Sequence, residues 1–294
     1  MPNLFSYRAE KNAKAWFFLL PALIFIFVFS VLPLIRTFEL SFLSNSILNA
    51  EFVQWENYAF VLKDPHFHKA LQNTSLFALI VVPLGMVISL IIAIILNQKI
   101  KGAKILETIF FLPYLTSIIA IGIVFRYLFH GNYGFINYFL SLFNLGPFDF
   151  LNNPKLNIIS LMIFGIWSSL AFNIIILLSG LRSIDKNFYT LAKMYGASPF
   201  EEFTKITLPS LIPILTFLSI TNFISAFKVY AQVFSLFNGK AGIGNAAVTS
   251  VFYIYNKFYV EARYGQGMAA AVILFLLILL FTLLQRFILK KISN

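Results

Sequence analysis

The sequence predicts an all-α integral membrane protein with six transmembrane helices and both termini in the cytoplasm. Of its 294 residues, 60% are hydrophobic and only 11% are charged, and the mean hydropathy is +0.84. A soluble fold has no use for that much apolar surface, so the composition indicates a chain embedded in a bilayer. Six apolar stretches and an uneven distribution of basic residues predict the number of helices and their direction.

Six stretches are long enough to supply the roughly 20 residues of helix that cross a hydrocarbon core. They are residues 16–35, 71–96, 105–129, 158–181, 211–230 and 268–287. The first is preceded by basic residues, as in a signal peptide, but its apolar run is too long and lacks a small-residue cleavage site. We therefore expect it to be retained as the first span.

The basic residues predict the topology. Thirteen of the 22 Lys and Arg residues lie on one side of the spans: Arg8, Lys11, Lys14, Lys99, Lys101, Lys104, Arg182, Lys186, Lys193, Lys205, Arg286, Lys290 and Lys291. Because basic residues accumulate on the cytoplasmic side, segments 1–15 and 288–294 are expected there, flanking a transmembrane domain over 16–287. These flanking positions also explain the net charge of +11, so we expect no nucleic-acid partner.

The loop between the fourth and fifth spans, residues 188–209, is polar but strongly patterned. Phe188, Leu191, Ala192 and Tyr195 recur at the spacing of one helical face. Gly196 suits a turn with positive φ, which residues with a Cβ adopt reluctantly. The loop is therefore predicted to begin with a short amphipathic helix that ends at this glycine.

A second short helix is predicted after the turn. Ser198 fits an N-cap, Pro199 the first helical position and Glu201 the return arm of a capping box. Phe200 and Phe203 begin its apolar stripe, and Leu208-Pro209 is expected to end it. Two short helices at an angle, lying on the cytoplasmic face, predict a docking surface for another protein.

The sequence lacks the groups that most enzymes need. No Walker-type loop is present, because the glycine-rich run 239–244 does not have the required order. There is no cysteine, and His66 and His68 have no further ligand group nearby, so no metal site is expected. The span interiors are almost free of charge, whereas ion-driven transporters need ionisable groups there. Energy for transport is therefore expected to come from outside this chain, which is predicted not to be an enzyme.

Mild polar groups and aromatic rings mark a candidate substrate path. The candidates are Asn173, Asn222, Phe223, Phe227, Lys228, Tyr230 and Gln232. Neutral hydrogen-bonding groups beside rings suit sugars, which offer hydroxyl groups and flat apolar faces. Each polar residue taken alone is better explained by hydrogen bonding between helices, and it is their clustering on the fifth span that favours a shared path.

Short motifs along nearly the whole chain resemble a known family. In the 188–209 loop they are Leu191-Ala192, Gly196-Ala197-Ser198 and Ile206-Thr207-Leu208-Pro209. Elsewhere they are Asn57-Tyr58, Ala70-Leu71-Gln72-Asn73-Thr74, Phe111-Leu112-Pro113, Gly134-Phe135-Ile136-Asn137 and Leu181-Arg182-Ser183-Ile184. As a set, they resemble the permease subunits of binding-protein-dependent ABC importers of the carbohydrate-uptake branch, which includes the larger permease of maltose systems and the glycerol-3-phosphate permease.

That resemblance implies a type I ABC importer permease fold in a bacterial plasma membrane. The 188–209 loop would be the EAA loop, with a coupling helix that docks on an ATPase subunit. The implied docking residues are Tyr189, Thr190, Leu191, Ala192, Tyr195, Gly196, Ala197, Ser198, Phe200 and Phe203. The implied partners are a second permease subunit, two ATPase subunits that bind ATP and Mg, and an extracytoplasmic binding protein that delivers a sugar or oligosaccharide. No cofactor is expected on this chain.

The chain departs from the family pattern at two positions. Thr190 stands where a glutamate is usual, and Tyr195 where an aspartate is common. An ionic contact to the ATPase is therefore in doubt. Three alternatives stay open: an anionic substrate, such as glycerol 3-phosphate or an acidic sugar, held by Lys228 and Arg126; a secondary transporter that works alone; and a membrane-bound enzyme.

Overall fold

The computed structural model describes residues 4–46, 50–98 and 101–293. Lys99 and the side chains of Arg8, Lys11, Lys14, Lys290 and Lys291, all assigned to the cytoplasmic side, lie outside what is described. Within these ranges the chain is helical apart from loops and one isolated β-bridge between Leu43 and Phe52. Contacts divide it into two units, residues 1–63 with 254–273 and residues 64–253 with 274–294.

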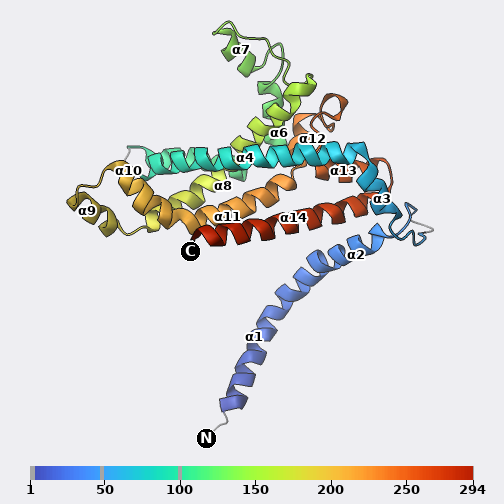
Figure 1. Ribbon diagram of the computed structural model, residues 1–294, viewed down its shortest axis with the longest axis horizontal. Helices are drawn as coiled ribbons and strands as arrows, with labels where there is room; N and C mark the ends of the chain where they lie inside the picture. The colour runs from blue at the N-terminus through green and yellow to red at the C-terminus, as the bar shows by residue number, and fades with distance from the viewer. Residues whose placement is uncertain (1–3, 47–49, 99–100, 294) are drawn as a thin grey trace. The chain divides into compact units, whose positions relative to one another are not determined.

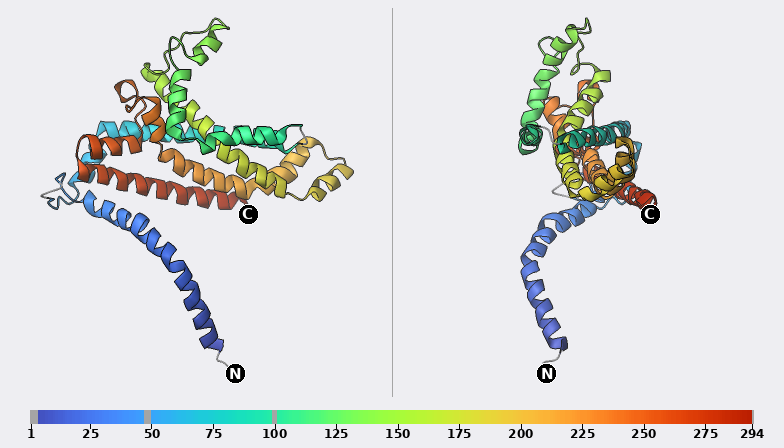
Figure 2. Two further views of the ribbon diagram at one scale, coloured as in Figure 1. Left: turned by 180° about the vertical axis from the view of Figure 1, so that it is seen from behind. Right: turned by 90° about the vertical axis from the view of Figure 1, so that its left-hand side faces the viewer.

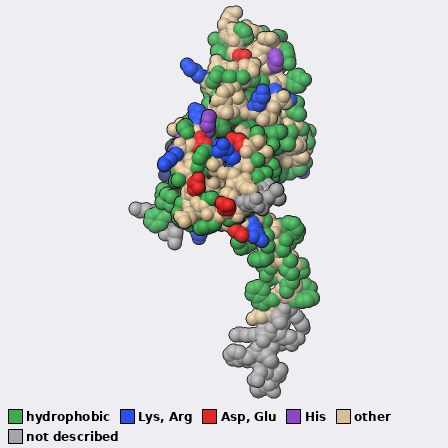
Figure 3. Space-filling model, turned by 90° about the vertical axis from the view of Figure 1, so that its right-hand side faces the viewer, with side chains coloured by type: hydrophobic (Ala, Val, Ile, Leu, Met, Phe, Trp, Pro, Cys, Tyr) green, Lys and Arg blue, Asp and Glu red, His purple; other side chains and the backbone are tan. Residues whose placement is uncertain are grey.

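The first unit begins with a long apolar helix. Its helical segments are α1 (Leu4–Ile26), a π-helical turn (Phe27–Val31), α2 (Leu32–Ser41), α3 (Glu56–Lys63), a second π turn (Asn256–Val260) and the start of α14 (Tyr264–Ser293). Residues 16–41 form a candidate span with none of its most apolar window buried within the chain. Hydrophobic side chains cover the face of this helix seen in Figure 3. Such a surface belongs in lipid or against another protein.

The backbone segments around residues 41–43, 57 and 265 of this unit lie close together. The buried Asn57 donates from Nδ2 to the carbonyls of Ser41 and Leu43, at 2.9 and 2.7 Å. A Cβ added at Gly265 would overlap the Leu43 carbonyl oxygen, so only glycine fits there. The loop after α2, which contains Leu43, therefore contacts both α3 and the start of α14.

The second unit is a bundle of long helices, with shorter ones at both ends. Its helices are α4 (Pro65–Asn97), α5 (Ala103–Leu115), α6 (Ile118–Leu128), α7 (Phe135–Ser141), α8 (Pro154–Ser183), α9 (Lys186–Met194), α10 (Pro199–Glu202), a π turn (Phe203–Thr207), α11 (Leu208–Phe227), α12 (Ala231–Leu236), a 3₁₀ turn (Ile243–Asn245), α13 (Ser250–Tyr255) and the rest of α14. In Figures 1 and 2, α4, α8 and α11 run side by side. Their core consists of aliphatic residues: Ala93, Leu96, Ile174, Leu177, Leu178, Leu181, Leu211 and Leu218.

The third predicted span differs from expectation. Residues 105–129 were expected to form one helix, but α5 and α6 meet at a break and are bent by 104°. Thr116 is extended at this break, directly after the last turn of α5, which contains Pro113. Beyond the break, α6 packs on α12, and a Cβ at Gly122 would overlap Ser235. Five helices in the described ranges are long and apolar enough to span a membrane, and the bent pair can supply a sixth.

Buried asparagines hold the loops that connect the helices of this unit. Asn73 donates from Nδ2 to the carbonyls of Ala246 and Val248, both at 2.9 Å. Asn137 likewise bonds backbone atoms of Gly131 and Phe148, and Asn157 bonds those of Leu151 and Ile243. Removing such a side chain leaves backbone groups unpaired, which explains why amides occupy these positions.

Candidate functional site

The 188–209 loop, here called the elbow, begins as the sequence predicts. Asp185 caps α9 by accepting from the backbone N–H of Asn187 at 2.9 Å. At the other end, Ala197 N–H donates to the Ala192 carbonyl and Gly196 N–H to that of Lys193, both at 3.0 Å. This is a Schellman ending, and Gly196 has the left-handed φ of +77° that it requires. The predicted turn at Gly196 is confirmed.

The second half of the elbow is built by the predicted capping box. Ser198 N–H donates to Glu201 Oε2 at 3.0 Å, and Glu201 N–H donates to Ser198 Oγ at 3.3 Å. The expected stop at Leu208-Pro209 is wrong, because the helix continues through both residues into α11. A π-helical turn precedes them, with Leu208 N–H bonded to the Phe203 carbonyl, and this irregular turn accommodates a proline that has no N–H.

The elbow presents apolar side chains to its surroundings. The exposed fraction is 90% for Tyr195, 78% for Met194 and 74% for Phe200, with Phe188 and Leu191 each more than half exposed. Figure 1 shows α9 and α10 together at one end of the bundle. An apolar cluster of this kind outside a packed core marks an interaction surface. Met194 is the exposed member that the sequence analysis did not single out.

The other predicted docking residues occupy different positions in the elbow. Tyr189, Ala192, Ala197 and Phe203 are half-buried, and the Tyr189 hydroxyl lies 2.9 Å from Thr207 Oγ1, tying α9 to the following helix. Thr190 is exposed, and its hydroxyl donates to the Lys186 carbonyl within α9. It therefore offers no charge to a partner.

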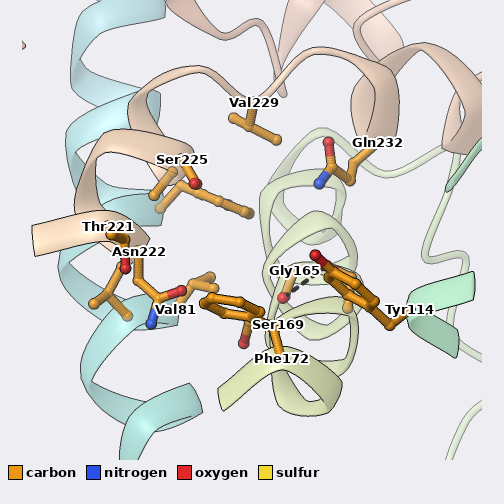
Figure 4. Close-up of a pocket in the computed structure, with 14 residues that line it drawn as sticks. Val81, Tyr114, Gly165, Ser169, Phe172, Thr221, Asn222, Ser225, Val229 and Gln232 are labelled. Carbon is orange, nitrogen blue, oxygen red and sulfur yellow. Dashed lines mark hydrogen bonds between the residues drawn. The ribbon is translucent and has the colours of Figure 1, made fainter. Parts of the chain in front are cut away.

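A pocket of about 380 Å³ lies inside the bundle. Figure 4 shows side chains from α4, α5, α8, α11 and α12 converging on it. Its lining, here called the neutral pocket, consists of Phe77, Val81, Val82, Tyr114, Gly165, Ser168, Ser169, Phe172, Thr221, Asn222, Ser225, Ala226, Val229 and Gln232. It combines two amides, four hydroxyl-bearing aliphatic side chains and three rings, and none of its residues is ionisable at neutral pH.

The pocket brings together only part of the predicted substrate path. Asn222 and Gln232 line it, and Asn173 lies behind Asn222, 1% exposed, accepting from Asn222 Nδ2 at 2.8 Å. Phe223 and Phe227 do not line it, and their rings pack on Phe281 of α14.

The remaining path candidates also lie elsewhere. Tyr230 packs against Phe234 and Phe252, and Lys228 is exposed at the end of α11. Lining residues that were not among the sequence-predicted candidates include Tyr114 from α5, Ser168, Ser169 and Phe172 from α8, and Thr221 and Ser225 from α11.

Comparison with known proteins identifies the family. Residues 85–294 match the family described as the binding-protein-dependent transport system inner membrane component. The chain belongs to this family. The permease is 31% identical to a trehalose/maltose transport system permease protein of Thermococcus litoralis, over 96% of this chain and 95% of that protein. It is 29% identical to a lactose transport system permease protein of Rhizobium radiobacter, over 94% of each.

Solved structures agree on the fold. A bacterial ABC transporter that imports the acidic polysaccharide alginate contains a chain that superposes with a TM-score of 0.86, covering 99% of both chains at 21% identity. At that identity the likeness shows the fold alone. The permease therefore has the type I ABC importer architecture that its sequence predicts, with its helices in the cell membrane.

Proposed function

We propose that this permease is the membrane-spanning subunit through which an ATP-driven importer takes up a neutral sugar or oligosaccharide. The observation that carries the proposal is the neutral pocket. Amides and hydroxyls can exchange hydrogen bonds with sugar hydroxyls, while Phe77, Tyr114 and Phe172 offer ring faces to C–H groups. Relatives named for trehalose, maltose and lactose transport support the same substrate class.

The elbow transmits to the permease the conformational change that ATP hydrolysis drives in a separate subunit. A separate ATPase subunit, which binds ATP and Mg, receives the exposed cluster around Tyr195 and Phe200 in a surface groove. A second permease subunit completes the pathway, a second ATPase subunit docks on it, and an extracytoplasmic binding protein delivers the solute. The exposed apolar side chains of the elbow support an apolar contact with the ATPase subunit. An ionic contact is not supported at position 190, because Thr190 has no carboxylate.

An anionic substrate is the less favoured alternative. It would need a cation facing the solute, yet neither Lys228 nor Arg126 lines the neutral pocket. Moving a carboxylate or phosphate from water into a pocket of neutral groups has a desolvation free energy of roughly several kcal/mol, unless a cation accompanies it.

Uptake of a saccharide panel tests this choice. The complete importer, reconstituted in vesicles with its binding protein, is expected to accumulate neutral saccharides such as maltose, trehalose or lactose in an ATP-dependent way. The K228Q variant should keep its uptake rate within about twofold, because an exposed side chain outside the pocket contributes little. Accumulation of acidic saccharides only, abolished by K228Q, would establish the anionic alternative instead.

A further inference from the structure

A second recess in the bundle unit has a different chemistry. It measures about 250 Å³ and is lined by residues from the end of α6, the loop before α8 and the loop after α12. Two cations, Arg126 and Lys240, line it together with Asn152 and Asn238, and Leu151 and Ile243 are among its apolar members. This cationic recess shares no residue with the neutral pocket.

Neither cation is neutralised within the described part of the chain. Arg126 is half-buried and Lys240 exposed, and no described side chain forms an ion pair or hydrogen bond with either of them. Asp149, the carboxylate of the neighbouring loop, instead accepts from Asn152 Nδ2, at 3.0 and 3.2 Å to its two oxygens. Two neighbouring cations without a charged partner attract an anion, so the recess is suited to an anion from outside.

The C-terminal end of α6 does not replace that anion. Arg126 lies in the last turn of α6, where the helix dipole favours a positive charge. That effect is small, however, and no described carbonyl accepts from its guanidinium. The five donors of the arginine are therefore free to hold a tetrahedral oxyanion.

Aromatic and aliphatic side chains are exposed beside the recess. Tyr127, next to Arg126, is 61% exposed, and Ile123 and Val124 one turn earlier are also exposed. Tyrosine is enriched at membrane–water interfaces, and exposed apolar side chains of a membrane protein contact lipid or a partner protein. Ile243 is 48% exposed at the recess itself and provides an apolar wall beside the two charges.

We propose that the cationic recess binds the phosphate group of an anionic phospholipid. Arg126 and Lys240 hold the phosphate oxygens, the asparagine amides border the headgroup, and the acyl chains contact the exposed apolar side chains beside the recess. Free inorganic phosphate has the same oxyanion chemistry, but it would make no use of the apolar wall.

Lipid binding to the purified, assembled importer tests the site. Native mass spectrometry with added phosphatidylglycerol should show binding weakened about fivefold by R126Q or by K240Q and about 25-fold by both, at about 1 kcal/mol per cation. R126K keeps the charge but loses the planar set of guanidinium donors, so its binding should lie between that of wild type and that of R126Q. K155Q, which removes an exposed cation outside the recess, should bind within twofold of wild type.

Two outcomes would overturn the proposal. If the doubly neutralised variant assembles and holds phosphatidylglycerol as wild type does, the recess is not the lipid site. If millimolar inorganic phosphate displaces the lipid completely from wild type, the recess serves a free anion. If a neutralised variant does not elute as the assembled importer, R126K takes its place in the comparison, and binding by R126K equal to that of wild type would then count against the recess.

Discussion

The G196V variant is expected to abolish coupled uptake while the protein still inserts in the membrane. Gly196 adopts φ of +77°, a region that β-branched residues enter only at a cost of about 2 kcal/mol or more. That cost lowers the population of the bent elbow by roughly 30-fold. Uptake by the reconstituted importer, and the ATPase activity that the loaded binding protein stimulates, should both fall by at least about tenfold.

Two control variants separate the bend from general strain. A Cβ at Gly196 meets no atom within 4 Å, so G196A adds only the backbone cost, about 1 kcal/mol, and should lose uptake partially. Gly102, before α5, has φ of +87° and equally open surroundings, so G102V imposes the same strain in another loop. G102V should keep coupled uptake. Full uptake by G196V, or equal losses in both valine variants, would contradict the role of the elbow.

Replacing the pocket amides is expected to have the second largest effect. Gln232 lines the neutral pocket, and no described residue bonds its side-chain amide, so Q232L should raise the KM of uptake about five- to tenfold without changing stability. N222L removes a pocket amide and also strips the buried Asn173 of its partner. It should therefore raise KM and lower the unfolding temperature together.

Phe223 provides the matched control for these variants. It lies beside Asn222 on α11, but its ring packs on Phe281, away from the pocket. F223L should lower the unfolding temperature and leave KM unchanged for each saccharide. If Q232L and N222L also left KM unchanged, the pocket residues would serve packing alone.

The elbow could be predicted from sequence because its signals are local. The helical face through Leu191 and Tyr195, the turn at Gly196 and the Ser198 capping box each depend on neighbours within a few residues. The continuation through Pro209 could not be predicted in the same way. A proline can end a helix or be accommodated by a π turn, and the choice depends on how the following helix packs.

The pocket was only partly predictable because it depends on how helices rotate and bend. Polar and apolar residues are spread around the whole of α11, so its sequence does not distinguish the face that carries Asn222 from the face that packs Phe223 on α14. Tyr114 reaches the pocket just before the break after α5. Pro113 was visible in the sequence, but the direction of the bend is set by the packing of α6 on α12.

The central claim is that ATP hydrolysis in a separate ATPase subunit drives transport through the elbow. Cross-linking from position 195 tests this claim most directly. The chain contains no cysteine, so Tyr195→Cys introduces one reactive thiol at a position that is 90% exposed in the tyrosine-bearing chain. In the assembled importer, a short cross-linker should join this thiol to the ATPase subunit, and an impermeant maleimide added to intact cells should not reach it. Labelling of that thiol from outside intact cells, with no ATPase product, would contradict the proposed coupling.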